Sequence, residues 1–286
     1  MIKQIVVGTD GSTEAKKAFD EALLIAQRID CSLKCVFIID LRKTQMPFIY
    51  AGGAYEGAYE RIYIPPDPSE KAFYEKLADD LDAFAEKCIA ELRQTAEEAG
   101  VAFESIVKSG YPGMELCDEA RSGGILAIGR RGENAHYKRS IVGSIAEDLT
   151  RQSPRPLLIC PTCSDRLETV LFPYDGSRTA EHALQFYVNC LKSLANDFVL
   201  LLVGEETSEE HAVEEELSYL NKHEIPVRIA RRQGVPSSEI LKVAGEEDVD
   251  LVVLGAHGKN KLRDYLVGST ASHIIHKSTV PVLLVY

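Results

Sequence analysis

The sequence repeats one strand-and-helix pattern, and this repeat restricts the fold more than any other feature. The stretch IVVGTDGSTEAKKAFDEALLIA starts at Ile5, and VLFPYDGSRTAEHALQFYVNCL starts at Val170. Each reads as an apolar strand, the triplet Asp-Gly-Ser, and a helix with apolar residues at three- and four-residue steps. The copies continue to match at residues 33–40 and 197–204, 109–120 and 233–244, 125–132 and 251–258, and 142–160 and 267–285. We therefore predict two tandem domains, residues 1–161 and 167–286.

Each copy alternates strands with helices in the order β-α-β-α-β-α-β-α-β. The strands are continuous apolar runs, which is typical of strands buried on both faces. Such strands, separated by helices, predict an α/β fold with a parallel, doubly wound sheet in each domain. The first copy also carries an insertion at about residues 41–75 that is rich in Gly, Pro and Tyr. A segment of this length is a surface excursion, a lid over a site, or a contact in a dimer.

The charge balance disfavours some classes of partner. The chain has 32 Lys and Arg against 44 Asp and Glu, which gives a net charge of −12. An acidic surface repels nucleic-acid backbones and anionic lipids, so we expect no nucleic-acid or membrane partner. No apolar run is long enough to cross a bilayer, and no signal-peptide core precedes Asp10, so we expect a cytoplasmic protein.

The seven cysteines form no regular disulfide pattern. Cys160 and Cys163 have the spacing of redox or metal-binding pairs, but they follow an apolar run and do not open a helix. We expect inert cysteines in the segment between the domains, with redox chemistry as the alternative.

Glycines and hydroxyls gather near one predicted sheet edge in the second copy. An apolar strand delivers two glycines to the carboxyl edge, where open α/β sheets bind ligands. A Gly-Ser-Thr triplet then opens the last helix, whose N-terminal N–H groups favour an anion. These features predict a phosphate site; the alternative is that the glycines only form turns and helix caps. The residues concerned are Leu254, Gly255, Gly258, Gly268, Ser269 and Thr270.

With FPYDGS at residues 172–177, the pattern Gly-x2-Gly-x9-Gly-Ser resembles the universal stress protein family, in the tandem form of its ATP-binding branch. The likeness covers essentially the whole chain. It implies the adenine nucleotide alpha hydrolase-like fold, with a five-stranded parallel sheet in each half. It also implies bound ATP, ADP or AMP, with or without Mg²⁺. By this resemblance Pro173, Tyr174 and Asp175 hold adenosine, Val203 and Leu254 flank adenine, and Gly255, Gly258, Gly268, Ser269 and Thr270 take the phosphates.

The first copy departs from the family pattern. Ten residues separate Gly132 from Gly143, where nine separate Gly258 from Gly268. The extra residue either bulges without effect or moves the phosphate-binding N–H groups out of register. Arg130 and Arg131 also replace Ala256 and His257. The corresponding nucleotide residues are Gly8, Thr9, Asp10, Ile38, Ile128, Gly129, Gly132, Gly143, Ser144 and Ile145.

The last strand of each copy is apolar and ends its predicted sheet, so each is an edge that needs cover. In the family the corresponding strands pair between units. The resemblance therefore implies that the two halves form a pseudo-dimer, and that two chains associate further as a homodimer.

No dedicated catalytic centre is recognisable. The sequence has neither Gly-x4-Gly-Lys-Ser/Thr nor Gly-x-Gly-x-x-Gly. We interpret His257 as a loop residue or phosphate hydrogen bonder, and we expect no metal at His273 and His276 because no further ligands are evident. The leading hypothesis is an ATP-binding stress-response sensor or regulator whose protein partner the sequence does not name. The alternatives are an interaction scaffold that binds no nucleotide and a slow ATPase.

Overall fold

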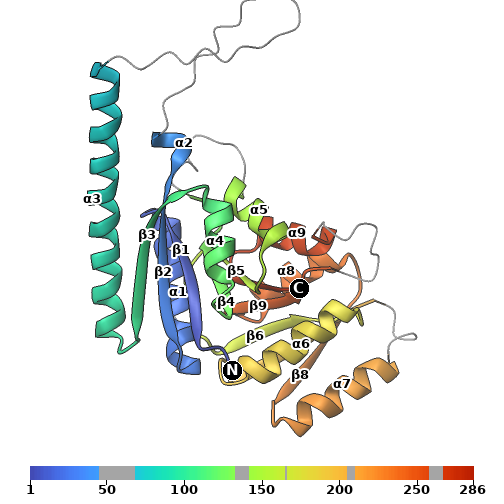
Figure 1. Cartoon of the computed structure of the whole chain (residues 1–286). Coiled ribbons are helices and arrows are strands. Elements are labelled where there is room, and N and C mark those ends of the chain that lie inside the picture. Colours follow the sequence, from blue (N-terminus) through green and yellow to red (C-terminus); the bar gives the residue numbers. More distant parts are fainter. Residues whose placement is uncertain (45–67, 133–141, 165, 205–209, 258–266) are drawn as a thin grey trace, which may run out of the picture.

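In the part of the chain that the structure describes, ten strands form one continuous sheet. The computed structural model describes residues 1–44, 68–132, 142–164, 166–204, 210–257 and 267–286. Within them, the strand order is β3-β2-β1-β4-β5-β10-β9-β6-β7-β8 (Figure 1). We call β1–β5 with α1–α5 the first half, and β6–β10 with α6–α9 the second half.

The first half alternates strands and helices as predicted. Its strands are β1 (Gln4–Thr9), β2 (Ser32–Asp40), β3 (Phe103–Gly110), β4 (Ile125–Gly129) and β5 (Leu157–Cys160). Its helices are α1 (Thr13–Ile29), α2 (Leu41–Thr44), α3 (Pro68–Glu98), α4 (Pro112–Ala120) and α5 (Ser144–Gln152).

In its described residues, which exclude 205–209, the second half repeats this order without a counterpart of α2. Its strands are β6 (Thr169–Pro173), β7 (Asp197–Val203), β8 (Val227–Arg232), β9 (Leu251–Gly255) and β10 (Val282–Val285). Its helices are α6 (Arg178–Cys190), α7 (Glu210–Lys222), α8 (Pro236–Glu246) and α9 (Ser269–Lys277).

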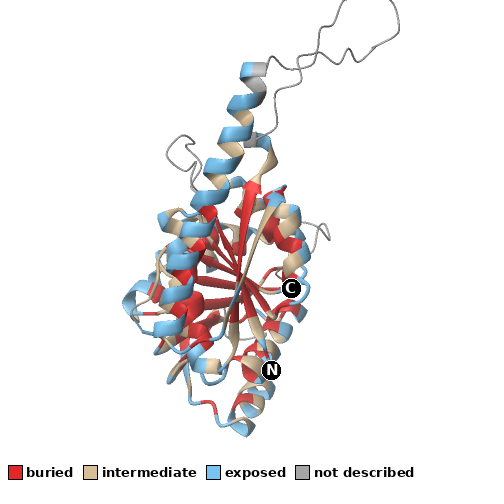
Figure 2. Ribbon diagram, turned by 60° about the vertical axis from the view of Figure 1, so that its left-hand side comes forward, coloured by how far each residue is buried: buried red, intermediate tan, exposed pale blue. Residues whose placement is uncertain are grey.

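Helices cover both faces of the sheet, because its inner strands are apolar on both sides. One apolar layer packs α1, α3, α6 and α7 against the sheet. The other packs α4, α5, α8 and α9 against the opposite face. The inner strands lie buried between these layers, whereas the edge strands β3 and β8 are partly exposed and the outer helix surfaces are exposed (Figure 2). Within each half the strands pair in parallel, so the predicted doubly wound α/β fold is confirmed.

The strand register corrects one sequence match. Gly8 pairs with Val36 in the first half, and the equivalent Pro173 pairs with Leu201 in the second. Val36 therefore corresponds to Leu201, and the predicted match of residues 33–40 with 197–204 is wrong by one residue. Uninterrupted apolar runs carry no polar marker that fixes their alignment, whereas the backbone ladder does. In the corrected alignment Ile38 and Val203 occupy equivalent positions.

The two halves join through an antiparallel pair of their last strands. Ile159, Leu158 and Leu157 of β5 pair with Val282, Leu283 and Leu284 of β10. All six side chains are buried. The pairing implied for these strands is therefore present within one chain, and it covers both apolar edges. Since the ten strands form one sheet, the domain boundary at residues 161–167 stays a prediction.

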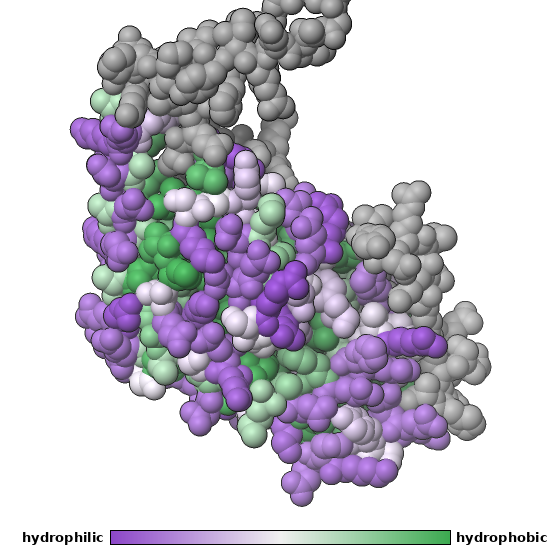
Figure 3. All heavy atoms as spheres, viewed as in Figure 1, coloured by the Kyte–Doolittle hydropathy of each residue, from purple (hydrophilic) through white to green (hydrophobic). Residues whose placement is uncertain are grey.

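The insertion contains the beginning of a long helix. The structure describes residues 41–44 and 68–75 of it, as α2 and the first turns of α3, whereas residues 45–67 lie outside the described part. The buried residues Ala85, Ile89 and Leu92 attach α3 to the core, and its opposite end extends past the sheet (Figure 1). The surface in this view is mostly hydrophilic, with a hydrophobic strip between α3 and α4 (Figure 3).

A buried carboxylate links α1 to the segment that connects the halves. Glu21 is fully buried, and its Oε2 accepts a hydrogen bond of 2.7 Å from the Ser164 N–H. Among the described residues, its buried Oε1 has no hydrogen-bond partner. Burial, with a smaller contribution from the charge of Asp250, raises the pKa of Glu21 to about 7, against the lowering effect of the Ser164 hydrogen bonds. Folding therefore favours the protonated carboxyl group at this position.

We predict that this carboxylate makes stability pH-dependent. A carboxyl group whose pKa is raised on folding stabilises the folded state. This stabilisation is fully present at pH values below the usual pKa of Glu, and it is lost as the pH rises through about 7. In Glu21→Gln the side chain does not titrate. The unfolding free energy of the wild type relative to Glu21→Gln should fall, by on the order of 2–3 kcal/mol, between pH 5 and pH 8. Urea unfolding at both pH values measures this; parallel profiles for the two proteins would contradict it.

Candidate functional site

A cavity of about 510 Å³ opens at the carboxyl ends of β1, β2 and β4 in the first half. The ten residues predicted for the first copy all line it, together with residues that the sequence did not single out. The predicted residues are Gly8, Thr9, Asp10, Ile38, Ile128, Gly129, Gly132, Gly143, Ser144 and Ile145. The others include Val36, Asp40, Arg42, Pro112, Leu116, Arg130, Arg131 and Glu147.

The cavity lies where the topology leaves a crevice. β1 pairs with β2 on one side and with β4 on the other. The helix after β1 covers one face of the sheet, and the helices before and after β4 cover the other. This is the switch point, at which open α/β sheets bind ligands.

One wall of the cavity is apolar. Ile38 and Ile128 belong to the apolar layer beneath α4 and α5, and both are buried. Leu116 of α4 lies in the same layer and also lines the cavity. Branched side chains on the two strands that flank β1 form a surface that suits a flat aromatic ring.

The cavity also reaches the N-terminus of α5. Gly143 is the N-cap, with φ −72° and ψ 151°, and it supplies no side-chain cap. By contrast, α1 is capped by Ser12, whose hydroxyl accepts from the Ala15 N–H at 3.2 Å. The first N–H groups of a helix have no intrahelical acceptor. Those of α5 therefore face the cavity without a side-chain cap, and they favour an anion there.

The glycines of these loops are present for two different physical reasons. A Cβ at Gly129 would lie 2.7 Å from the backbone carbon of Glu14, and one at Gly255 would lie 2.7 Å from that of Thr179. These two glycines are required because the loop crosses the start of α1 or α6. A Cβ at Gly143 would approach no atom closer than 3.5 Å, and its φ suits any residue. Packing therefore does not explain Gly143, whereas a ligand close to the backbone would.

The extra residue in the first loop leaves the loop ends in register. The Gly143 N–H donates to the Arg130 carbonyl at 2.9 Å, and the Gly268 N–H donates to the Ala256 carbonyl at 2.9 Å. Arg130 is equivalent to Ala256, and Gly143 is equivalent to Gly268. The difference in length is therefore confined to residues between these ends, most of which lie outside the described part of the chain.

The aspartates after β1 and β6 also have equivalent geometry. Oδ1 of Asp10 accepts from the Ser12 N–H at 3.0 Å, and Oδ1 of Asp175 accepts from the Ser177 N–H at 3.0 Å. Gly132 packs against Asp10, since a Cβ there would lie 2.8 Å from Oδ2. Each carboxylate is thus held at the carboxyl edge of its half.

Charged side chains surround the mouth of the first cavity. Asp40 and Arg42 form a bidentate pair, with Nε–Oδ1 at 2.8 Å and Nη2–Oδ2 at 2.5 Å, and the hydrogen bonds to Asp40 raise the pKa of Arg42. Burial, followed by the charge of Arg131, lowers the pKa of Arg130. Glu147 adds a carboxylate in the first turn of α5.

The structure places the second-half residues at the corresponding edge. Val203 and Leu254 belong to the same apolar layer as Ile38 and Ile128. Gly268 is the N-cap of α9, which begins at Ser269 and contains Thr270, and no side chain caps it. Gly258 lies outside the described residues.

Tyr174 faces away from the apolar layer that contains Val203 and Leu254. Its ring lies in the layer under α6 and α7, and its hydroxyl is 3.2 Å from Oε1 of Glu216. Burial, then Glu216, raises its pKa. The Tyr174 N–H already donates to the Leu201 carbonyl at 2.9 Å. The side chain and the N–H of Tyr174 are therefore both engaged within the protein. A ligand at this edge would contact Pro173 and Tyr174 through their other backbone atoms.

Several residues around the first cavity were missed by sequence reasoning. Asp40 directly precedes the insertion and has no carboxylate as its predicted match, Gly204, whereas Arg42 lies in the insertion, which has no match in the repeat. Glu147 has the hydroxyl residue Ser272 as its counterpart in the second half, so the repeat pointed away from a carboxylate. Proximity to the cavity in three dimensions was the signal that was lacking.

The remaining candidate residues have local partners. The His276 Nδ1 lies 2.7 Å from the Ser272 carbonyl, and the His257 carbonyl accepts a hydrogen bond from the Thr179 hydroxyl. Cys160 is buried, and its pKa is raised by that burial. In the described part of the chain, no three His, Cys, Asp or Glu side chains gather as metal ligands. No described helix is long and apolar enough to cross a membrane.

We predict that two glycine substitutions separate packing from ligand binding. Gly129→Ala places a methyl group against the α1 backbone and should lower the unfolding free energy by about 1–3 kcal/mol. Gly143→Ala makes only ordinary van der Waals contacts, the nearest at 3.5 Å, and should lower it by less than about 1 kcal/mol. Denaturant unfolding of both variants measures the difference. Equal destabilisation would show that Gly143 is also a packing residue.

Comparisons with known proteins agree with the repeat and the fold. The model of the universal stress protein family matches residues 1–161 and 167–286. A universal stress protein of Synechocystis sp. is 25% identical over an alignment of 294 positions, which covers 99% of each chain. The crystal structure of a universal stress protein from Archaeoglobus fulgidus matches with a TM-score of 0.75 at 22% identity, over 99% of this chain and 97% of the other. That of a putative universal stress protein from Pseudomonas aeruginosa matches with a TM-score of 0.62 at 15% identity, over 99% and 93%.

The two matches to one family model together span nearly the whole chain and coincide with the two copies of the repeat. This chain therefore belongs to the universal stress protein family, in its tandem form.

Proposed function

We propose that the first half binds an adenine nucleotide in the cavity of about 510 Å³, and that the chain is a nucleotide-dependent stress-response regulator. The observation that carries the proposal is the cavity at the switch point, which ends at the uncapped N-terminus of α5. Its volume lies within the range of small-molecule sites. Family membership supports the regulatory role.

Each wall of the cavity fits a different part of such a ligand. Ile38 and Ile128 would contact the adenine ring, and the carboxylate of Asp10 would accept a hydrogen bond from a ribose hydroxyl. The N-terminus of α5 would receive the phosphates, because Gly143 lets them approach the backbone. Arg131, which also lines the cavity, would add positive charge.

Glu147 opposes an anion at the same end of the cavity. Its carboxylate lies in the first turn of α5, where α9 has no acidic residue. A Mg²⁺ ion carried by the nucleotide would offset this charge, since Mg²⁺ binds through one or two carboxylates together with phosphates. We therefore propose that the first half favours the Mg²⁺-bound nucleotide.

The second half is proposed to bind a nucleotide through the equivalent positions. The apolar pair Val203 and Leu254, the carboxylate of Asp175 and the uncapped start of α9 have the arrangement seen in the first half. A cytoplasmic location and association of two chains as a homodimer belong to the same proposal, which rests for these two points on the family resemblance.

The test begins with the purified full chain. Freshly purified protein is denatured, and released small molecules are identified and counted by mass spectrometry; one or two adenine nucleotides per chain are expected. Calorimetric titration with ATP then measures binding with and without Mg²⁺. Absence of both released nucleotide and binding heat up to millimolar ATP would exclude the proposal and favour a scaffold that binds no nucleotide.

We predict that Gly143→Ala weakens ATP binding to the first half by at least about tenfold, because its methyl group occupies the space over the α5 N-terminus. Gly245→Ala is the matched control, since a Cβ there has no neighbour within 4 Å and the position lies in α8, away from the cavity. Calorimetry on both variants measures the effect. Unchanged binding in Gly143→Ala would contradict the assignment of α5 as the phosphate site.

A further inference from the structure

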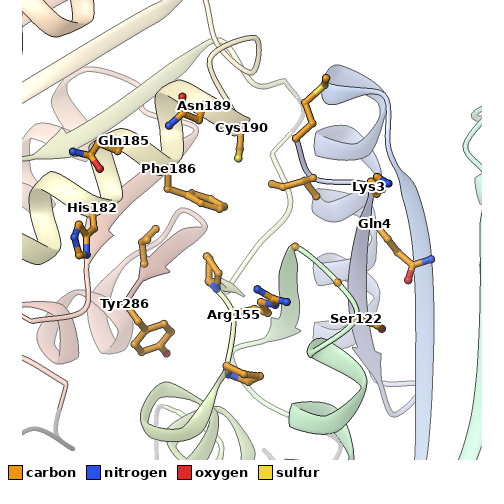
Figure 4. A pocket seen from close by; sticks show the side chains of 17 residues that line it. Lys3, Gln4, Ser122, Arg155, His182, Gln185, Phe186, Asn189, Cys190 and Tyr286 are labelled. Atoms are coloured by element: carbon orange, nitrogen blue, oxygen red, sulfur yellow. The ribbon is translucent and has the colours of Figure 1, made fainter.

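A second open groove, of about 680 Å³, lies between the two halves. On one side are α6 residues, and on the other are the segments that lead into β1, β4 and β5 of the first half (Figure 4). The end of β10 and the following Tyr286 form its floor. This groove is separate from the cavity at the carboxyl ends of β1, β2 and β4.

The halves are related by an approximate two-fold axis, so this groove has an equivalent elsewhere in the molecule. The equivalent lies between α1 and the segments that lead into β6, β9 and β10. There, the chain that follows β5 fills the space. Pro161 takes the position equivalent to Tyr286, and the chain continues through residues 162–164 towards β6. Residues 161–164 occupy this equivalent groove, and the groove beside α6 is open in the structure.

The filled groove shows how a peptide is held at this place. The Lys17 Nζ donates to the Pro161 carbonyl at 3.3 Å, and the Ser164 N–H donates to Glu21 at 2.7 Å. The Ser164 hydroxyl donates to the Asp250 carbonyl at 3.0 Å. Contacts to main-chain atoms dominate, which is the usual way of holding a short segment without regular secondary structure.

The open groove has a different set of side chains at the equivalent positions. His182 replaces Lys17, Phe186 replaces Glu21, and Gly124 replaces Asp250. The half-buried Phe186 ring points into the groove (Figure 4). Substitution of both acidic residues removes negative charge and adds an apolar contact surface.

The charge of the open groove contrasts with that of the molecule. None of its 17 lining residues is Asp or Glu, although the chain contains 44 of them. Lys3 and Arg155 supply positive charge, and Gln185 and Asn189 of α6 supply exposed amides. Arg155 donates one N–H to the Arg121 carbonyl at 2.8 Å, and a guanidinium has five in all. Arginine and amide side chains suit a carboxylate and a peptide backbone respectively.

We propose that this groove binds an extended acidic peptide segment of a partner protein, in the manner in which the equivalent groove holds residues 161–164. Lys3 and Arg155 receive acidic side chains, Phe186 receives an apolar one, and Gln185 and Asn189 bind the main chain. The proposal is independent of nucleotide binding.

The test uses the full chain and fluorescein-labelled octapeptides with blocked ends. One peptide contains three aspartates and two leucines, and a second has lysines in place of the aspartates. Fluorescence anisotropy should show binding of the acidic peptide alone, and added salt should weaken it. Lys3→Glu and Arg155→Glu should each weaken it by about tenfold. Lys222→Glu, an exposed charge reversal on α7, is the matched control and should have no effect beyond about twofold.

A second measurement locates the peptide. Cys190 lines the groove and is partly exposed, whereas the partly exposed Cys88 lies on α3. The acidic peptide should slow alkylation of Cys190 and leave that of Cys88 unchanged, as read by mass spectrometry. Failure of the acidic peptide to bind, equal binding of the basic peptide, or binding that is insensitive to both Lys3→Glu and Arg155→Glu would overturn the proposal. Binding of the acidic peptide without protection of Cys190 would do so as well.

Discussion

The antiparallel pairing of β5 with β10 is the constraint on which the rest of the structure depends. Each half alone would end in an apolar strand with unpaired backbone groups, which invites association with other chains. Three buried residue pairs cover both edges at once. Because the pair is antiparallel, the carboxyl ends of the strands in the two halves point in opposite directions. The two candidate nucleotide sites therefore lie at opposite edges of one sheet.

The same pairing creates composite surfaces that neither half has alone. A pocket of about 240 Å³ lies between α5 and α9 and is lined by equivalent residues from both. They are Val142 with Val267, Glu147 with Ser272, Thr150 with Ile275, and Arg151 with His276. Three of the four pairs differ in chemistry. The interface between the halves has thus diverged although its backbone geometry is repeated.

Arg130 shows how far this divergence goes. Its Nη1 donates to the Ser278 carbonyl at 2.7 Å, at the C-terminal end of α9, where a cation is favourable. Its equivalent, Ala256, has no side chain long enough for such a contact. Among the described residues, the buried Nε of Arg130 has no hydrogen-bond partner, which costs free energy. The loop of the first cavity is therefore attached to the second half, and no corresponding contact from Ala256 is possible.

The sequence by itself determined the repeat, the doubly wound α/β class and the ten residues that gather around the first cavity. The repeat and the fold class follow from local patterns: apolar runs mark strands, Ser12 and Ser177 mark helix starts, and strands of a parallel sheet bring their following loops to one edge. The ten residues were implied by the resemblance of this pattern to the universal stress protein family. Only the tertiary structure decided the register between Gly8 and Val36 and the roles of the individual glycines. Register depends on backbone pairing between runs that look alike, and the need for glycine at Gly129 depends on a helix far away in sequence. The open groove beside α6 likewise depends on the two-fold arrangement, because its walls come from both halves of the chain.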